Sequence, residues 1–241
     1  FISEEQRLKL AKDFLPQILL NDVNQLASEW ITDENRVVVL TATEKDGVEM
    51  PTEAEILEKF EEVDNMTIEP YEDKVIDKPL FDKELKSGSI AETKVYEKTE
   101  VTEYRLSNGA KVVFKNTDFK NDEVLMDASS QGGSSLYSED EYMTAEMASS
   151  IVGESGLSEF SSSDLSKLLT DKKVSVYPYI SRNYEGFNGN FSPNDAETFF
   201  QMLHLYFTNP RIDKSSAESF IEKQTGIYKN ILSNPDYYFF D

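Results

Sequence analysis

The chain of 241 residues contains no cysteine and a single histidine, His204. Disulfide bonds, thiolate catalysis, cysteine-ligated zinc and iron–sulfur clusters are therefore excluded. A catalytic zinc site usually takes at least two histidines, so this chain cannot supply one alone. The fold must be held by an apolar core, for which 39% hydrophobic and 12% aromatic residues are sufficient.

The charge balance limits the partners of the chain. It carries 46 Asp and Glu residues against 24 Lys and Arg, which gives a formal net charge of −22. A protein that binds duplex nucleic acid or an anionic membrane needs a basic surface, so we expect neither as a partner. No apolar run approaches the ~20 residues that span a bilayer. The first residue is Phe1 rather than Met, and we expect the chain to be a piece of a longer protein.

The first 47 residues have the pattern of two helices followed by a strand. Ser3 opens the capping box Ser-Glu-Glu-Gln, and apolar residues follow it at helical spacing. Asn21 is the expected N-cap of a second helix, whose apolar face includes Trp30. The run Val-Val-Val-Leu within residues 35–43 predicts a buried strand because it is short, β-branched and bounded by polar residues. Three elements are too few for a domain, so their apolar faces need further partners.

Residues 48–100 have the composition of a connector. The stretch is strongly acidic and contains Pro51, Pro70 and Pro79. One helix is expected in it, opened by the capping box Thr-Glu-Ala-Glu at residues 52–55. The remainder is polar and punctuated by proline, which is typical of a chain that runs between two globular bodies.

Residues 101–241 have the pattern of an α+β domain. Asn108-Gly109 between two β-rich runs is a strong hairpin signal because both positions tolerate positive φ. The predicted strands span residues 104–106, 111–114, 123–130, 174–180 and 184–191. The predicted helices span residues 138–153, 163–169, 195–207 and 215–232, and the last is broken by Asn234-Pro235.

The residues that could suggest catalysis also have structural interpretations. His204 has apolar neighbours on nearly all sides of its predicted helix, which favours a structural, partly buried role. Residues 153–156, Gly-Glu-Ser-Gly, lack the second glycine of a nucleophile elbow, since Leu157 stands there, and are typical of a helix end. The serines at 161–163 indicate an N-cap, and Gly132-Gly133 a turn from strand to helix.

The ordered strings at residues 15–42, 101–142, 155–180 and 203–220, followed by NPDYYFFD at the end, resemble the pitrilysin (insulinase) family of zinc metallopeptidases. The resemblance covers nearly the whole chain and is to the long bacterial members with two homologous halves. It implies that residues 1–47 end the preceding peptidase-like domain, residues 48–100 form the acidic linker between the halves, and residues 101–241 form most of the third domain. The fold it implies is α+β, with a mixed, largely antiparallel sheet and helices packed on one face.

The resemblance also places a degenerate zinc motif on the helix after Gly132-Gly133. The catalytic half of the family holds zinc through His-x-x-Glu-His and a downstream Glu, with the motif Glu as general base. In this chain Glu146 and Ser150 stand at the two histidine positions and Ser149 at the position of the base. We therefore expect no catalytic and no metal-binding residues in this fragment, and a zinc ion only in the N-terminal half of the parent protein.

The resemblance implies that the chain forms part of the non-catalytic half of a zinc endopeptidase that closes around peptides. The expected partners are peptide substrates and the catalytic half of the same chain, and the expected location is the bacterial periplasm, with the cytoplasm as the alternative. A second hypothesis is a non-enzymatic peptide-binding or scaffolding module of the same superfamily. A third is an unrelated hydrolase that uses Ser155 or Ser163.

Overall fold

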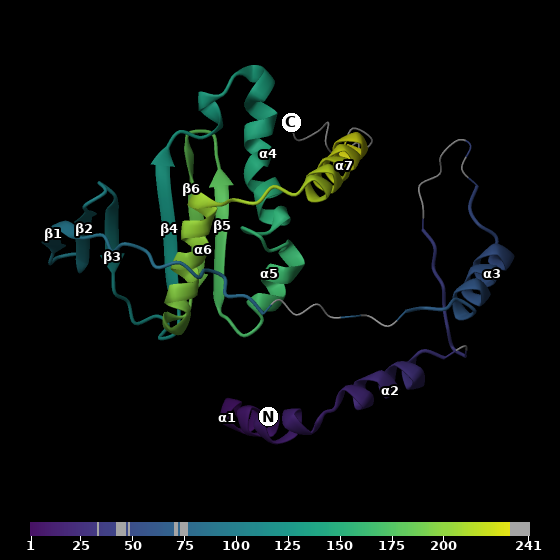
Figure 1. The fold of residues 1–241 in the computed structure, drawn as a ribbon. Helices are drawn as coiled ribbons and strands as arrows, with labels where there is room; N and C mark the ends of the chain where they lie inside the picture. The colour runs from purple at the N-terminus through teal and green to yellow at the C-terminus, as the bar shows by residue number, and fades with distance from the viewer. Residues whose placement is uncertain (33, 42–46, 48, 70–71, 73–76, 232–241) are drawn as a thin grey trace. The chain divides into compact units, whose positions relative to one another are not determined.

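The computed structural model describes residues 1–231 except 33, 42–46, 48, 70–71 and 73–76. The chain divides into two compact units, Phe1–Glu72 and Asp73–Asp241, which are described separately below (Figure 1). The described elements of the first unit are α1 (Glu4–Phe14), the 3₁₀ turn η1 (Leu15–Gln17), α2 (Leu20–Trp30) and α3 (Glu53–Asp64).

The two capping boxes predicted in the first unit are confirmed. Ser3 accepts a hydrogen bond from Gln6 N–H, and its own N–H donates to the Gln6 side chain. Thr52 and Glu55 make the same reciprocal pair at the start of α3. The predicted cap Asn21 is wrong, because α2 begins one residue earlier, at Leu20.

The strand predicted within residues 35–43 is not present in residues 35–41, and residues 42–43 lie outside the described part of the chain. A strand needs a neighbouring backbone, and no described segment pairs with this one. Val38 and Leu40 instead line a cleft of about 620 Å³ together with Ile56 and Phe60 of α3. The β-branched run therefore shares a cleft with a helix, and the sequence of this segment could not reveal that it lacks a strand partner among the described residues.

The second unit contains the remaining described elements. Its strands are β1 (Ile90–Tyr96), β2 (Val101–Leu106), β3 (Lys111–Lys115), β4 (Val124–Gln131), β5 (Val174–Ile180) and β6 (Tyr184–Phe191). Its helices are α4 (Glu139–Ser155), α5 (Ser162–Leu168), α6 (Ala196–Thr208) and α7 (Lys214–Ile231), and its 3₁₀ turns are η2 (Ser134–Leu136) and η3 (Pro193–Asp195). The break expected at Asn234-Pro235 lies outside the described residues.

The first sheet is antiparallel with the order β1-β2-β3. The predicted hairpin at Asn108-Gly109 is confirmed: Gly109 has a φ of 89°, and the Asn108 side chain accepts from Ala110 N–H. The sequence missed β1, which lies inside the predicted connector and pairs with β2. All its residues are exposed, so no buried apolar face marks it as a strand in the sequence.

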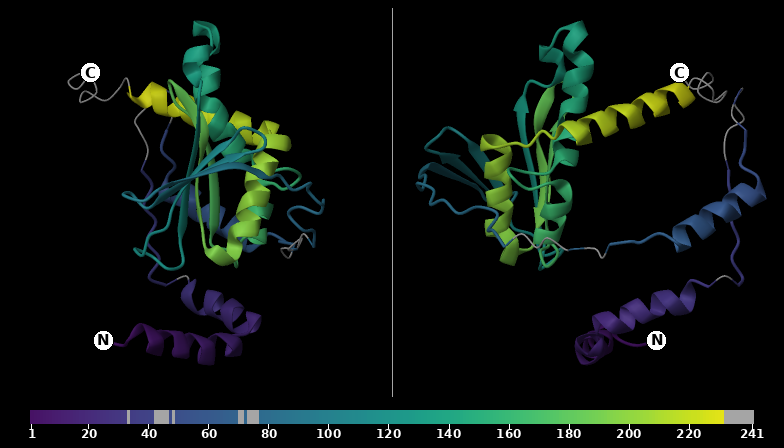
Figure 2. Two further views of the ribbon diagram at one scale, coloured as in Figure 1. Left: turned by 90° about the vertical axis from the view of Figure 1, so that its left-hand side faces the viewer. Right: turned by 45° about the vertical axis from the view of Figure 1, so that its right-hand side comes forward.

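The second sheet is antiparallel with the order β4-β6-β5, and one of its faces carries the core (Figures 1 and 2). Helices α4 and α6 pack along β5. The rings of Phe191 and Phe199 lie 4.3 Å apart, and Phe199 is fully buried. Gly189 makes this approach possible, because a Cβ there would lie 2.6 Å from the Phe199 ring. The buried cluster consists of Leu157, Val176, Phe191, Phe199, Met202 and Leu205.

The second unit has the predicted fold class, α+β with antiparallel sheets and helices on one face. The strands at residues 174–180 and 184–191 have the predicted bounds. Helix α4 ends near Gly153, as predicted, with Ser155 as its last residue and Gly156, at a φ of 96°, as the residue that ends it. Among the described residues, no helix is both long and apolar enough to cross a membrane.

Candidate functional site

The turn before α4 positions the degenerate motif. Gly133 has a φ of 72°, and a Cβ there would lie 2.1 Å from the carbonyl oxygen of Ser181. Only glycine fits, so the chain leaves β4 through a fixed turn into η2 and α4. The N–H of Ser134 donates to the same carbonyl at 2.9 Å, and Ser138 then caps α4. The orientation of α4 against the sheet is thus set at its start.

Glu146 on α4 supports this turn through a hydrogen bond. Its Oε1 accepts a hydrogen bond of 2.6 Å from the hydroxyl of Ser134, whose side chain is completely buried. A buried hydroxyl without a partner would destabilise the fold, so the carboxylate has a structural task. In the sequence Glu146 stands out only as a motif position, and its contact with Ser134 could not be predicted from it.

Ser149 and Ser150 lie one turn further along α4. Ser149 lines two adjacent clefts of about 400 and 500 Å³, and Ser150 lines the second. A hydroxyl is a poor zinc ligand, and zinc sites take thiolate, imidazole or carboxylate donors. No group of three His, Cys, Asp or Glu side chains that could hold a metal occurs among the described residues. Glu146, Ser149 and Ser150 together therefore do not fit a zinc ion.

Of the two clefts beside Ser149, the one of about 400 Å³ has the more apolar lining. It lies between α4, the sheet and the end of α6. Val152, Phe187 and Tyr206 contribute to its wall. Burial raises the pKa of the Tyr206 hydroxyl, with a smaller contribution from Tyr177. The sequence did not predict this cleft, because its lining comes from separate elements and has no local signature.

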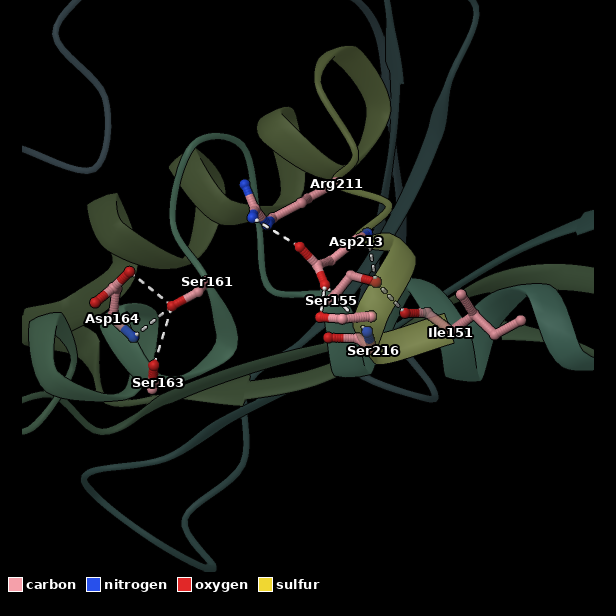
Figure 3. Close-up of polar contacts among 9 residues, drawn as sticks. Ile151, Ser155, Ser161, Ser163, Asp164, Arg211, Asp213 and Ser216 are labelled. Atoms are coloured by element: carbon pink, nitrogen blue, oxygen red, sulfur yellow. Dashed lines mark hydrogen bonds and ion pairs between the residues drawn. The ribbon is translucent and has the colours of Figure 1, made fainter. Parts of the chain in front are cut away.

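Ser155 does not have the environment of a nucleophile (Figure 3). It is 1% exposed, donates to the carbonyl oxygen of Ile151 at 2.7 Å and accepts from Asp213 N–H at 3.0 Å. Each hydrogen bond joins the Ser155 hydroxyl to a backbone group. Ser155 therefore connects the end of α4 to the segment before α7. The prediction that residues 153–156 belong to a helix end is confirmed, with Gly156 as the terminating residue.

The N-cap predicted within residues 161–163 is confirmed, and the capping residue of α5 is Ser161 (Figure 3). The Ser161 hydroxyl accepts from Asp164 N–H at 3.2 Å and shares a hydrogen bond of 3.0 Å with the Ser163 hydroxyl. The Asp164 carboxylate accepts from Ser161 at 2.6 Å. None of these contacts involves His204, although a serine nucleophile at Ser163 would need a general base such as a histidine.

His204 lies on α6 in the partly buried environment that the sequence predicts. Its ring meets the ring of Phe81 edge to face, with the centroids 5.2 Å apart. Its backbone carbonyl accepts from the Thr208 hydroxyl at 2.8 Å. The contact with Phe81, which lies far earlier in the chain, could not be predicted from helical spacing.

No family model matches the chain, but two curated relatives do. The probable zinc protease PqqL of Haemophilus influenzae is 24% identical over 230 residues, which cover 95% of this chain and 25% of that protein. The zinc protease PQQL-like of Arabidopsis thaliana is 29% identical over 197 residues, which cover 81% of this chain and 20% of that protein. The chain thus spans a quarter or less of the length of these relatives.

Two solved structures share the fold. The periplasmic protease PqqL from Escherichia coli matches 98% of this chain and 26% of its own, with a TM-score of 0.60 and 19% identity. The ferredoxin protease FusC, solved in complex with Arabidopsis ferredoxin, matches 88% of this chain and 24% of its own, with a TM-score of 0.53 and 22% identity. The predicted resemblance to insulinase-family zinc peptidases is confirmed.

Proposed function

We propose that this chain, a relative of insulinase-family zinc proteases, forms part of the non-catalytic half of a zinc metalloendopeptidase and helps to enclose a chamber for peptides. The proposal rests on the position of helix α4 and on the side chains at its motif positions. Helix α4 follows the strand-to-helix turn at Gly133, but its side chains Glu146, Ser149 and Ser150 do not form a zinc donor set. A domain related to the peptidases but without their metal chemistry is suited to binding and enclosure.

The proposed organisation follows the resemblance. Residues 1–47 complete a preceding peptidase-like domain, residues 48–100 connect the two halves, and residues 101–241 form most of the third domain. The largely exposed apolar residues of α1 and α2 support the first assignment, because such faces are normally covered by another part of a protein. Zinc would be held by the catalytic half of the longer protein and would activate water there.

The residues of this chain would contribute contacts to the peptide. The apolar cleft beside Ser149 can accept an aliphatic or aromatic side chain, and the strands at the edges of the sheet can offer backbone groups to an extended peptide. Neither contact requires a proton transfer or a nucleophile from this chain.

Peptide hydrolysis tests the proposal. The purified chain, supplied with zinc, should not cleave a mixture of quenched fluorogenic peptides, while an intact zinc endopeptidase serves as the positive control. Cleavage that co-purifies with the chain and disappears in Glu146→Ala would show that this half is catalytic and would refute the proposal.

A scaffolding module of the same superfamily is the alternative, and the longer protein distinguishes it. A His-x-x-Glu-His helix in the part that precedes this segment supports the peptidase half, and its absence supports the scaffold. We place the longer protein in the bacterial periplasm by analogy with the Escherichia coli periplasmic protease PqqL. Recovery of the tagged protein in the osmotic-shock fraction would support this location, and recovery with cytoplasmic enzymes would exclude it.

A further inference from the structure

The segment 78–85 leads to β1 and passes beside α6 (Figure 1). The side chain of Phe81 joins it to this helix. Leu80 and Phe81 are partly buried and pack against the core cluster of the second unit. Phe81 contacts the ring of His204 on α6 edge to face. This segment belongs to the predicted connector, yet its apolar residues are held by the domain body.

A second contact lies at the start of the same segment. Lys78 Nζ donates to Glu159 Oε2 at 2.6 Å, in the loop between α4 and α5. This hydrogen bond raises the pKa of the Lys78 ammonium above its ordinary value. Both side chains are more than 60% exposed, so the ion pair is weak and sensitive to salt. The apolar contacts of Leu80 and Phe81 therefore supply most of the attachment.

The attachment is incomplete along the segment. A cavity of about 730 Å³ lies between residues 78–85 and the body, where His204, Thr208 and Asn209 line it. A fully packed core element leaves few voids larger than a water molecule. The segment thus lies beside an open space and is held to the body by Lys78, Leu80 and Phe81.

We propose that residues 78–85 are a latch that fixes the connector to the second unit through Phe81–His204 and Lys78–Glu159. The latch rests on the proposed function for its purpose: while it is closed, residues 78–85 are held on the body of the second unit and are not part of the free connector. Release of the latch would lengthen the free connector and allow a wider opening of the chamber.

The absence of cysteine allows the latch to be tested directly in the 241-residue chain. A nitroxide attached to Lys83→Cys reports the mobility of the latch by electron paramagnetic resonance. We expect restricted motion in the otherwise unchanged chain and motion several-fold faster when Phe81→Ala is added. Phe119→Ala is the matched control, because Phe119 is 89% exposed and lies outside the latch.

Two further variants keep the test decisive if Phe81→Ala fails to fold. Glu159→Gln and Lys78→Gln change only exposed side chains and should each increase the mobility of the label modestly, as should high salt, whereas Glu154→Gln should not. Unchanged spectra in every latch variant that folds, and at high salt, would refute the latch. This result would leave the proposed function intact, because the experiment involves no peptide and no zinc.

Discussion

At the scale of single residues, the carboxylate of Asp213 is held by three neighbouring groups. Its carboxylate accepts from the Ser215 hydroxyl at 2.6 Å and from Ser216 N–H at 3.0 Å, and Arg211 lies 3.2 Å away. These hydrogen bonds to Ser215 and Ser216, more than the charge of Arg211, lower the pKa of Asp213 from 3.8 to about 2. Asp213 therefore acts as the N-cap of α7.

The lowered pKa of Asp213 predicts a loss of stability in acid. The folded state binds the proton more weakly than the unfolded state, so the contribution of Asp213 is complete above pH 3.8 and disappears as the pH falls to about 2. Asp213→Asn should retain most of the cap but weaken this acid dependence, while Asp213→Ala should lower stability at neutral pH as well. Urea unfolding at several pH values between about 2 and 7 measures the effect. Identical pH profiles for the wild type and Asp213→Asn would contradict it.

The contacts that could be predicted from the sequence are those made between residues close together in the chain. The capping boxes at Ser3 and Thr52 and the turn at Asn108-Gly109 depend on neighbours within a few positions. The structural tasks of Glu146 and His204 depend on Ser134 and Phe81, which the fold alone brings close. The sequence shows that Glu146 is a carboxylate and His204 an imidazole, but it does not show which side chains they contact.

At the scale of elements, two glycines have opposite predicted effects. Gly189 on β6 lies under α6, and a Cβ there would lie 2.4 Å from the Ser175 carbonyl oxygen and 2.6 Å from the Phe199 ring. Gly153 lies inside α4, and a Cβ there would have no atom within 4 Å beyond its own helix backbone and chain neighbours. The first glycine is required by packing, while the second only weakens its helix.

Alanine substitutions test this difference. Gly189→Ala should lower the free energy of unfolding by about 1–3 kcal/mol or more, because the strand and α6 must move apart. Gly153→Ala should raise it by roughly 0.5–1 kcal/mol, because alanine favours the helix. Chemical denaturation of both variants measures the two values. A stabilising Gly189→Ala would show that α6 does not pack on β6 at this position.

Strands with a strong side-chain pattern were predicted correctly from the sequence. The errors concern which segments find a neighbouring strand to pair with. The strands at residues 174–180 and 184–191 were correct in type and bounds. The strand expected within residues 35–43 lacks a partner among the described residues, while β1 was overlooked because its partner β2 supplies the pairing. Strand formation depends on a second backbone, which the sequence of one segment does not contain.

At the scale of the whole molecule, the net charge of −22 predicts a preference for cationic peptides. If this acidic surface lines the proposed chamber, it would raise the local concentration of basic substrates, and salt would screen the effect. In the longer protein, kcat/KM for a basic peptide should fall as salt rises, while a neutral peptide of equal length should change little. Equal turnover of acidic and basic peptides at low salt would contradict this expectation.

The central claim is that this chain belongs to a non-catalytic half, and zinc stoichiometry tests it most directly. The 241-residue chain is equilibrated with zinc, dialysed, and assayed by mass spectrometry of the metal beside Glu146→Ala. We predict far less than one zinc per chain and no difference between the two proteins, because Glu146 is engaged by Ser134 and the other motif positions are serines. One tightly bound zinc per chain that is lost in Glu146→Ala would contradict the claim.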